Sequence, residues 1–220
     1  MVPSVDQGEV ALRLVSFGSA TLGESGAIAL PPKLRPMWPG AAFAAPAFTV
    51  ACPPGDNLAM HAGIAKAAAG AALVVSVAGD VPCGYWGEVM TVAAQSVGVV
   101  ALVIDGPVRD VDAMRRRRFP VFARGTALRG ATKTGPGTLG GPVAIADTLV
   151  FSGDWLIGDA DGIVVVRAGT LAACERAASE RTLKEGRFFE SLQAGKTTVA
   201  LLGLDISNIS LWAPTGGQGS

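Results

Sequence analysis

Two short stretches of the chain contain residue types that together can bind an anion and a metal ion. The first is Trp86-Gly87-Glu88, and the second, Asp105 to Asp110, follows after an interval that a helix would fill. Arg109 can hold a carboxylate through two parallel hydrogen bonds, and Asp110 beside it can ligate a hard divalent cation. The spacing therefore predicts a metal-assisted site that acts on a small anionic substrate.

The helix expected to begin at Glu88 would add backbone donors to this site. The first amides of a helix have no partner within it and carry partial positive charge. The amides of Val89 and Met90, just after the flexible Gly87, would therefore form a notch for a carboxylate. The Glu88 side chain is a candidate to hold a metal-bound water or to move a proton. Each carboxylate taken alone also fits a structural role, because an acid at a helix start stabilises the helix dipole by about 0.3–1 kcal/mol.

Alternating strands and helices would position both stretches at one edge of a sheet. Strands are expected at 47–52, 73–77, 99–104 and 119–123, and helices at 57–69 and 88–97. We expect Asp56 to cap the first helix and Gly98 to end the second one. In such repeats ligands bind at the carboxyl ends of the strands, which is where Asp105 to Asp110 would lie.

The chain changes character after Gly130, where glycine and threonine loops separate short strands. These strands are expected at 143–145, 148–151, 155–157 and 162–167. A long amphipathic helix at 171–194 would follow, and residues 203–220 would form a tail. We interpret residues 1–220 as a single domain with a core that spans about 20–195.

Composition excludes several classes of partner. The formal net charge of the 220 residues is zero, and nucleic-acid binding normally needs a clustered basic surface. The basic run Arg115 to Arg118 would point round most of a helix circumference, which suits a solvated helix end or a subunit contact. No apolar run reaches the roughly 18 residues of a membrane span, and Met1 to Arg13 lacks the pattern of a secretory signal. We therefore expect a cytoplasmic protein that binds neither nucleic acid nor membranes.

Cysteine and histidine usage narrows the metal chemistry. Cys52, Cys83 and Cys174 are far apart and form no CxxC pair, which fits buried thiols in a reduced compartment. His61 is the only histidine, so a zinc centre built on several histidines is impossible within one chain. A catalytic metal would be held mainly by oxygen, which favours Mg²⁺ or Mn²⁺.

Five segments in a fixed order resemble one known family. They are Gly55 to His61, Trp86 to Glu88, Val103 to Asp110, Phe119 to Gly125 and Gly158 to Val166. Over roughly residues 20 to 195 the chain resembles the RraA-like family, which unites 4-hydroxy-4-methyl-2-oxoglutarate aldolase with the regulator of ribonuclease E activity A. The resemblance implies an α/β fold, a three-layer β/β/α sandwich similar to a swivelling domain, with N- and C-terminal helices.

The resemblance also implies a role for each site residue. The aldolases carry Arg-Asp where the ribonuclease regulator carries Arg and a neutral amide, and this chain has Arg109-Asp110. By resemblance, Asp110 ligates Mg²⁺ or Mn²⁺ and Arg109 binds the pyruvoyl group. Glu88 acts through water, and the amides of Val89 and Met90 after Gly87 bind the substrate carboxylate. Glu185 from a neighbouring subunit reaches the metal waters, which implies a homotrimer or a hexamer of two trimers.

The implied activity is that of a carbon–carbon lyase. A class II aldolase of this kind cleaves 4-hydroxy-4-methyl-2-oxoglutarate to pyruvate and decarboxylates oxaloacetate through one pyruvate enolate, whose charge the metal and Arg109 stabilise. Two alternatives stay open: a lyase of the same mechanism on another 2-keto acid, and a non-catalytic ring that binds a ribonuclease. A Schiff-base mechanism is disfavoured, because Lys66, Lys133 and Lys184 have no predicted apolar pocket.

Overall fold

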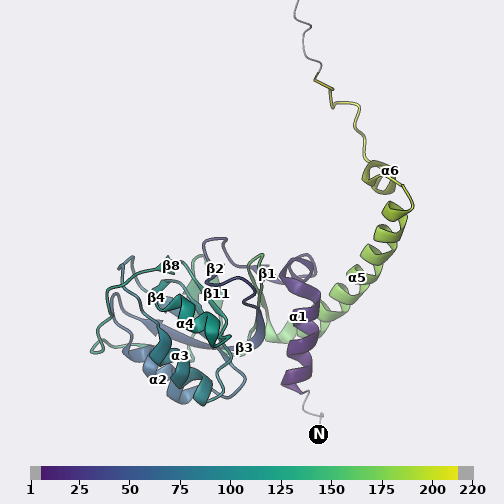
Figure 1. Cartoon of the computed structure of the whole chain (residues 1–220). Helices are drawn as coiled ribbons and strands as arrows, with labels where there is room; N and C mark the ends of the chain where they lie inside the picture. The colour runs from purple at the N-terminus through teal and green to yellow at the C-terminus, as the bar shows by residue number, and fades with distance from the viewer. Residues whose placement is uncertain (1–5, 213–220) are drawn as a thin grey trace, which may run out of the picture. The chain divides into compact units, whose positions relative to one another are not determined.

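The computed structural model describes residues 6–212, and the chain divides into two compact units (Figure 1). The first unit is Met1–Ser179 and the second is Glu180–Ser220. Of the tail expected at 203–220, residues 213–220 lie outside the described part. Within residues 6–212, no helix has the length and apolar character needed to cross a membrane.

A nine-stranded sheet forms the centre of the first unit. Its strand order is β1-β13-β12-β3-β4-β5-β7-β2, and β9 pairs with β3 outside this path. The strands β3, β4, β5 and β7 are mutually parallel, as the repeated strand and helix pattern predicts, and the other pairs are antiparallel. The bounds are β1 Ile28–Ala29, β2 Arg35–Pro36, β3 Phe43–Cys52, β4 Ala72–Val77, β5 Ala101–Ile104, β7 Val121–Ala123, β9 Thr138–Leu139, β12 Trp155–Gly158 and β13 Ile163–Val166.

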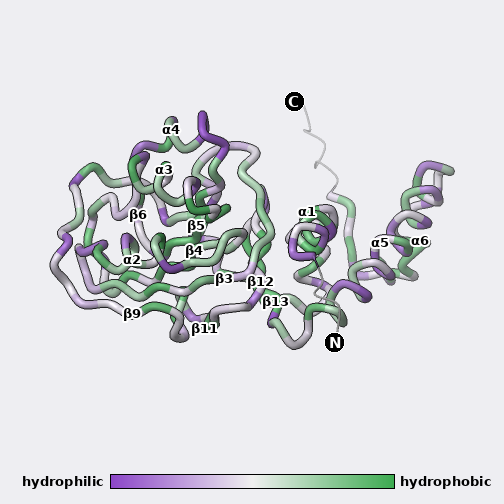
Figure 2. The backbone as a smooth tube through the Cα atoms, turned by 90° about the horizontal axis from the view of Figure 1, so that it is seen from below, coloured by the Kyte–Doolittle hydropathy of each residue, from purple (hydrophilic) through white to green (hydrophobic). Residues whose placement is uncertain are grey.

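Both faces of this sheet are covered, so its central strands are apolar throughout. Helices α2 (Leu58–Lys66), α3 (Glu88–Ser96) and α4 (Val111–Arg116) cover one face, and the hairpin of β10 (Val143–Ile145) and β11 (Thr148–Val150) covers the other. Along β4, Leu73 and Val75 pack with the helices, whereas Ala72 and Val74 pack with the hairpin. This alternation follows from the two-residue period of a strand. Figure 2 shows the hydrophobic central strands between α3 and α4 on one side and β11 on the other.

Helix α1 (Gln7–Gly23) packs beside β12 and β13. Leu14 and Leu22 are buried there in a cluster with Trp155 and Ile157. The helix is interrupted at Gly18, whose φ of 77° and ψ of 159° are not helical. Ser19, the residue after Gly18, donates hydrogen bonds from its backbone amide and its hydroxyl to the Asp159 carboxylate, both at 2.6 Å. These bonds fix the interruption in place.

The helix ends test the capping predictions. Gly98 follows α3 with a φ of +82°, the left-handed conformation predicted for it. The capping prediction for Asp56 is wrong by one position, because Asn57 is the N-cap residue of α2. Asp56 still accepts a hydrogen bond from the amide of Leu58 at 2.8 Å. Its carboxylate also binds the loop around Thr134, so the backbone at Asp56 is held outside the helix.

Two short strands complete the elements beside the expected site. They are β6 (Pro107–Val108) and β8 (Gly125–Thr126), which pair in parallel. Asp105, at the end of β5, forms an ion pair with Arg124 and accepts a hydrogen bond from the amide of Ala146 at 3.0 Å. This carboxylate therefore fastens the hairpin turn to the sheet rather than facing a ligand.

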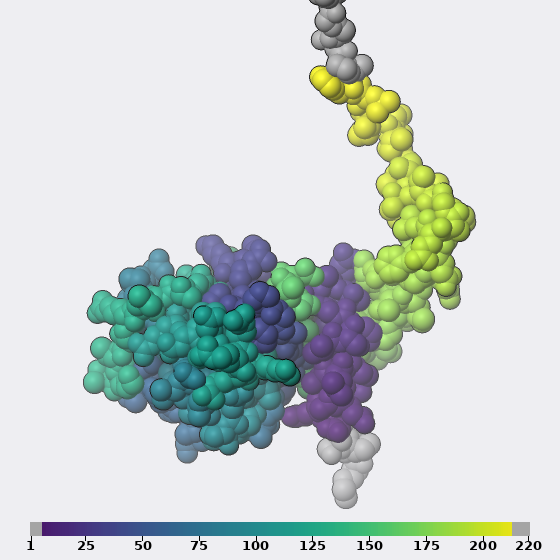
Figure 3. Space-filling model, viewed as in Figure 1, coloured from purple at the N-terminus to yellow at the C-terminus, as the bar shows by residue number. Residues whose placement is uncertain are grey.

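The second unit contains the end of a long helix and a short one. Helix α5 (Leu171–Gln193) spans the boundary between the units, follows a 3₁₀ turn at Ala168–Thr170, and buries Cys174 and Ala178 in its first part. Helix α6 (Thr198–Leu202) is capped by the Thr197 hydroxyl. The unit, yellow-green in Figure 3, exposes several large apolar side chains: Leu183, Phe189, Leu202, Leu204, Ile206, Ile209, Leu211 and Trp212.

Candidate active site

A cleft of about 230 Å³ lies where the predicted stretches meet. Of the predicted site residues, it is lined by Gly87, Val89, Met90, Arg109 and Asp110. The other lining residues come from the start of α2 and from two loops: Asn57, His61, Gly84, Tyr85, Trp86, Gly130, Ala131 and Lys133. The structure thus brings together the start of α3 and the Arg109-Asp110 pair, as the sequence predicts.

Backbone hydrogen bonds hold the two predicted stretches side by side. The amide of Tyr85 donates to the carbonyl of Pro107 at 3.0 Å, and the amide of Arg109 donates to the carbonyl of Trp86 at 2.9 Å. The approach is so close that a Cβ atom on Gly87 would collide with Oδ2 of Asp110. Glycine at position 87 is therefore a packing requirement of the site.

Asp110 adopts an unusual backbone conformation that directs its side chain to α3. Its φ of 60° and ψ of 36° lie in the left-handed region, which aspartate tolerates better than most residues but which still costs energy. Oδ2 accepts a hydrogen bond from the amide of Glu88 at 3.0 Å and lies 3.9 Å from Nε of Arg109. Among residues 6–212, nothing donates a hydrogen bond to Oδ1. One carboxylate oxygen thus holds the helix start while the other is open to a ligand.

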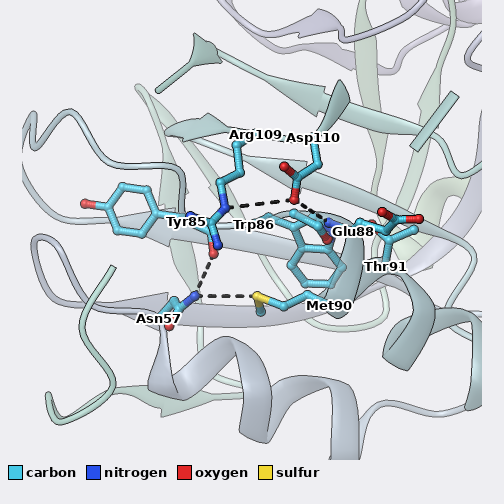
Figure 4. A network of polar contacts seen from close by, with 9 residues as sticks. Asn57, Tyr85, Trp86, Glu88, Met90, Thr91, Arg109 and Asp110 are labelled. Atoms are coloured by element: carbon cyan, nitrogen blue, oxygen red, sulfur yellow. Dashed lines mark hydrogen bonds and ion pairs between the residues drawn. The ribbon is translucent and has the colours of Figure 1, made fainter. Parts of the chain in front are cut away.

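The buried Trp86 side chain supports the site from the core of the protein. It is 1% exposed and stacks on Phe119 with a centroid separation of 6.2 Å. Its Nε1 donates to Oγ1 of Thr91 at 2.8 Å, and that hydroxyl donates to the carbonyl of Gly87 at 3.1 Å (Figure 4). The indole therefore fixes the first turn of α3 against the core.

Glu88 contributes its amide to the site, whereas its carboxylate lies outside the cleft. Oε1 accepts hydrogen bonds from Nε and Nη2 of Arg117 at 3.0 and 2.8 Å. Figure 4 shows this carboxylate pointing away from Arg109. Exposed ion pairs contribute only about 0–1 kcal/mol, so little energy would be needed to release it. A role through water requires that release, and it stays a prediction.

Glu185 lies in the second unit, on α5. Its Oε1 pairs with Nε of Arg181 at 2.8 Å, one helical turn away. Both residues border a hollow of about 220 Å³ together with Lys184, Phe188 and Leu202. The role implied for Glu185 belongs to an assembly of several chains, so it also stays a prediction.

Asn57 and His61 line the cleft from α2 and its N-cap. Asn57 is 6% exposed, and its Nδ2 donates to the carbonyl of Tyr85 at 2.8 Å. Among residues 6–212, Oδ1 of Asn57 and Nε2 of His61 are buried without a hydrogen-bond partner. A buried group left unpaired costs about 1–3 kcal/mol, so both atoms suit a bound ligand. Burial and the nearby Lys133 cation lower the pKa of His61, which favours neutral imidazole.

A loop fastened by Asp56 carries Lys133 to the cleft. The Asp56 carboxylate accepts hydrogen bonds from the Thr132 hydroxyl and the Thr134 amide at 2.7 Å, and from the Gly135 amide at 2.9 Å. Burial alone would raise the pKa of Asp56, but these bonds hold it well below its usual range. The loop is therefore anchored on both sides of Lys133.

The metal-ligating groups in the cleft fit one hard cation held by a single carboxylate. Among residues 6–212, no group of three or more acidic, histidine or cysteine side chains could hold a metal ion. Mg²⁺ is commonly bound through one or two carboxylates, with substrate and water in the remaining positions. The open Oδ1 of Asp110 suits that mode of binding.

The sequence matches a family model described as RraA-like, Aldolase/RraA, over residues 19–165. This match covers the sheet, α2, α3 and all the predicted site residues except Glu185. The chain belongs to the RraA-like family.

Proteins with curated names also match part of the chain. It is 32% identical over 136 residues to a protein of Halalkalibacterium halodurans that is provisionally named a 4-hydroxy-4-methyl-2-oxoglutarate aldolase. That match covers 62% of this chain and 65% of the relative, just under two thirds of its length. A Burkholderia mallei protein with the same provisional name is 33% identical over 136 residues, which is 82% of its length and 62% of this chain.

Solved structures support the same fold. An uncharacterized protein from Pseudomonas syringae matches with a TM-score of 0.76 and 27% identity, over 86% of this chain and 94% of the other. Streptomyces coelicolor RraAS2, described as an unusual member of the RNase ES inhibitor RraA family, matches with a TM-score of 0.72 and 24% identity, over 86% of this chain and 97% of the other. The predicted α/β, RraA-like fold is confirmed, and at this identity the second likeness shows the fold alone.

Sequence reasoning assigned no site role to Asn57, His61 or Lys133. Asn57 and His61 belong to the Gly55 to His61 segment that carries the RraA-like resemblance, so a signal was present there. Lys133 gives no such signal, because it reaches the cleft only through the long-range bonds of its loop to Asp56.

Proposed function

We propose that this RraA-like protein is a divalent-metal-dependent carbon–carbon lyase. It would cleave 4-hydroxy-4-methyl-2-oxoglutarate to pyruvate and decarboxylate oxaloacetate. The observation that carries the proposal is the open Oδ1 of Asp110, held beside Arg109 at the start of α3. The provisional aldolase names of the two curated relatives support it.

The chain's own groups suit a 2-keto acid. Val89 and Met90, in the first turn of α3, line the cleft, and a helix supplies no acceptor for the amides of its first turn. We assign them to the substrate carboxylate, and we assign the Arg109 guanidinium to the keto oxygen beside it. Mg²⁺ or Mn²⁺ held by Asp110 would supply Lewis-acid polarisation of the keto group.

One bond cleavage accounts for both reactions. In aldol cleavage the C4 hydroxyl loses its proton, the C4 carbonyl forms, and the electron pair of the C3–C4 bond passes into pyruvate enolate. In decarboxylation the same pair is released when the C4 carboxylate leaves as carbon dioxide. Arg109 can stabilise the enolate oxygen in both cases, and protonation at C3 then gives pyruvate.

We further propose that the protein works in the cytoplasm as a homotrimer or a hexamer. In such an assembly Glu185 of a neighbouring subunit and Glu88 would reach the metal through water. This assignment rests on the family resemblance and extends to the second unit, which lies outside the matched residues 19–165.

The test is pyruvate release from both substrates with Mg²⁺ or Mn²⁺, before and after addition of EDTA. Asp110→Asn keeps an acceptor for the Glu88 amide and removes the anionic ligand. It should lower kcat/KM at least about 100-fold, because metal polarisation contributes several kcal/mol. The matched control is Asp112→Asn, which removes an exposed acid of α4 that pairs with Arg115.

Full activity of Asp110→Asn would refute the metal assignment. Absence of pyruvate release by the wild-type protein from any 4-substituted 2-keto acid would refute the lyase. Metal-independent capture of a ribonuclease would then favour the regulator alternative.

A further inference from the structure

The basic run Arg115 to Arg118 has no part in the proposed bond cleavage, but one of its members contacts the first residue of α3. Arg117 is the C-cap residue of α4, and its Nε and Nη2 donate to Oε1 of Glu88 at 3.0 and 2.8 Å. Arg115 pairs instead with Asp112, on α4 itself. Within the run, Arg117 is therefore the residue that reaches the edge of the candidate active site.

Hydrogen bonds hold the backbone at both ends of this ion pair. The amide of Glu88 donates to Oδ2 of Asp110 at 3.0 Å, a bond drawn in Figure 4. The amide of Arg117 donates to the carbonyl of Ala113 at 3.0 Å, and the carbonyl of Arg117 accepts from Nε2 of Gln95, on α3, at 3.1 Å. The pair can therefore open through a change of side-chain rotamer, without a shift of either helix.

The exposure of the pair makes it easy to open. The side chains of Arg117 and Glu88 are 40% and 41% exposed. Water competes for such a pair and salt screens it. An exposed ion pair changes an equilibrium by about fivefold at most. The Glu88 carboxylate can therefore exchange between Arg117 and another position.

The charges of the cleft are unbalanced while Glu88 stays on Arg117. The charged residues that line the cleft are Arg109, Lys133 and Asp110, and Glu88 is not among the lining residues. Two cations and one carboxylate leave an excess of positive charge, which opposes binding of a divalent cation at the open Oδ1 of Asp110. A second carboxylate would remove that excess, and Glu88 is placed to supply it because its own amide bonds to Asp110.

We propose that Arg117 is a positioning residue that keeps the Glu88 carboxylate out of the cleft and so lowers the affinity of the site for Mg²⁺ or Mn²⁺. When the ion pair opens, Glu88 turns to the cleft and acts on the metal through water. The contact between α4 and the first residue of α3 then sets the metal concentration at which the site is loaded. This inference rests on the proposed function, because it concerns the metal of that same site.

A binding experiment tests the inference without substrate. The affinity for Mn²⁺ is measured from the electron paramagnetic resonance signal of the free ion. Arg117→Met removes the guanidinium and should raise the affinity about two- to fivefold, the range open to an exposed ion pair. Arg117→Lys keeps a positive charge and a donor and should stay near wild type. Arg116→Met, the matched control, removes the same charge from the exposed neighbouring residue and should leave the affinity nearly unchanged.

Two further titrations show whether Arg117 acts through Glu88. In a Glu88→Gln background, Arg117→Met should have no effect on Mn²⁺ affinity, because the carboxylate that it would release is absent. The ratio of the Arg117→Met and wild-type affinities should also fall toward 1 as the ionic strength rises from about 0.05 to about 0.5 M, since salt screens the ion pair. The ratio cancels the effect of salt on Mn²⁺ itself.

A kinetic experiment separates metal loading from a structural defect. With oxaloacetate as substrate, Arg117→Met should lower the Mn²⁺ concentration for half-maximal pyruvate release by the same two- to fivefold as in the binding experiment. The change of kcat at saturating Mn²⁺ should be much smaller. A structural defect would lower kcat and leave the Mn²⁺ requirement unchanged or higher.

Mn²⁺ affinity of Arg117→Met at or below that of wild type would overturn the inference. An equal rise in Arg116→Met, or a rise that persists in the Glu88→Gln background, would overturn it as well. A wild-type protein that binds Mn²⁺ but releases no pyruvate from any 4-substituted 2-keto acid would refute the proposed lyase instead. The Mn²⁺ titrations would then still decide the role of Arg117.

Discussion

Substitution of Gly87 tests whether the position of Asp110 determines activity. Gly87 has extended backbone angles, φ −157° and ψ −165°, which alanine can adopt. A Cβ atom there would collide with Oδ2 of Asp110, so the carboxylate must move by about 1 Å to regain ordinary van der Waals separation. The movement breaks the 3.0 Å hydrogen bond from the Glu88 amide.

Both consequences of Gly87→Ala can be given magnitudes. Loss of a hydrogen bond to a charged group costs about 1.5–3 kcal/mol, and the exposure of this one places it at the lower end. Misplacement of a catalytic group by about 1 Å can lower the rate about 100-fold. Activity should therefore fall far more than stability, which separates the site effect from unfolding.

The assay is Mn²⁺-dependent pyruvate release from oxaloacetate, with urea unfolding of the same preparation as the stability measurement. Gly169→Ala is the matched control, because a Cβ atom there meets nothing within 4 Å. A folded Gly87→Ala protein with wild-type kcat/KM would show that the geometry of Asp110 does not control the reaction.

Three other predictions follow from the contacts and pKa values. The pKa of Asp56 is lowered in the folded protein, so the stabilisation of the fold by its carboxylate should be complete above its unfolded pKa of about 3.9 and lost as the pH falls below that value. The difference in the free energy of unfolding between wild type and Asp56→Asn, measured in urea, should therefore shrink as the pH falls. Burial raises the pKa of the Cys52 thiol to about 11, so iodoacetamide at pH 8 should label Cys52 only in unfolded protein, and rapid native labelling would contradict the burial. If Glu185 acts across a subunit boundary, the inactive Asp110→Asn and Glu185→Gln variants should regain activity when they are unfolded together and reassembled, because a mixed assembly contains sites with both native residues. If both residues act within one subunit, the mixture should stay inactive.

Local patterns predicted the parts of the site that depend on neighbours in sequence. The apolar run of β5 and the helix after Gly87 have clear periodicity, and the carboxyl ends of parallel strands meet at one edge of a sheet. The approach of Arg109 to the start of α3 follows from these two features. Helix starts can therefore be placed from the sequence within one or two residues.

Side-chain direction and loop position were not predictable in the same way. Glu88 begins α3, and from the sequence alone its carboxylate could face the cleft or the end of α4. The structure places it against Arg117, because α3 packs beside α4. Lys133 reaches the cleft through bonds between its loop and Asp56, about 80 residues earlier in the chain. Such long-range bonds have no periodic signature in the sequence.

The chemistry at position 110 is not dictated by the fold. The structural tasks there are to adopt left-handed angles and to accept a hydrogen bond from the Glu88 amide. Asparagine performs both tasks, since it tolerates the left-handed region as well as aspartate does and its amide oxygen is an acceptor. The two residues differ in the negative charge and in the second oxygen, which asparagine replaces with an NH₂ donor. In this chain the second oxygen is Oδ1, which is open to a ligand. An acid at this position therefore argues for cation binding on grounds that are independent of the stability of the fold.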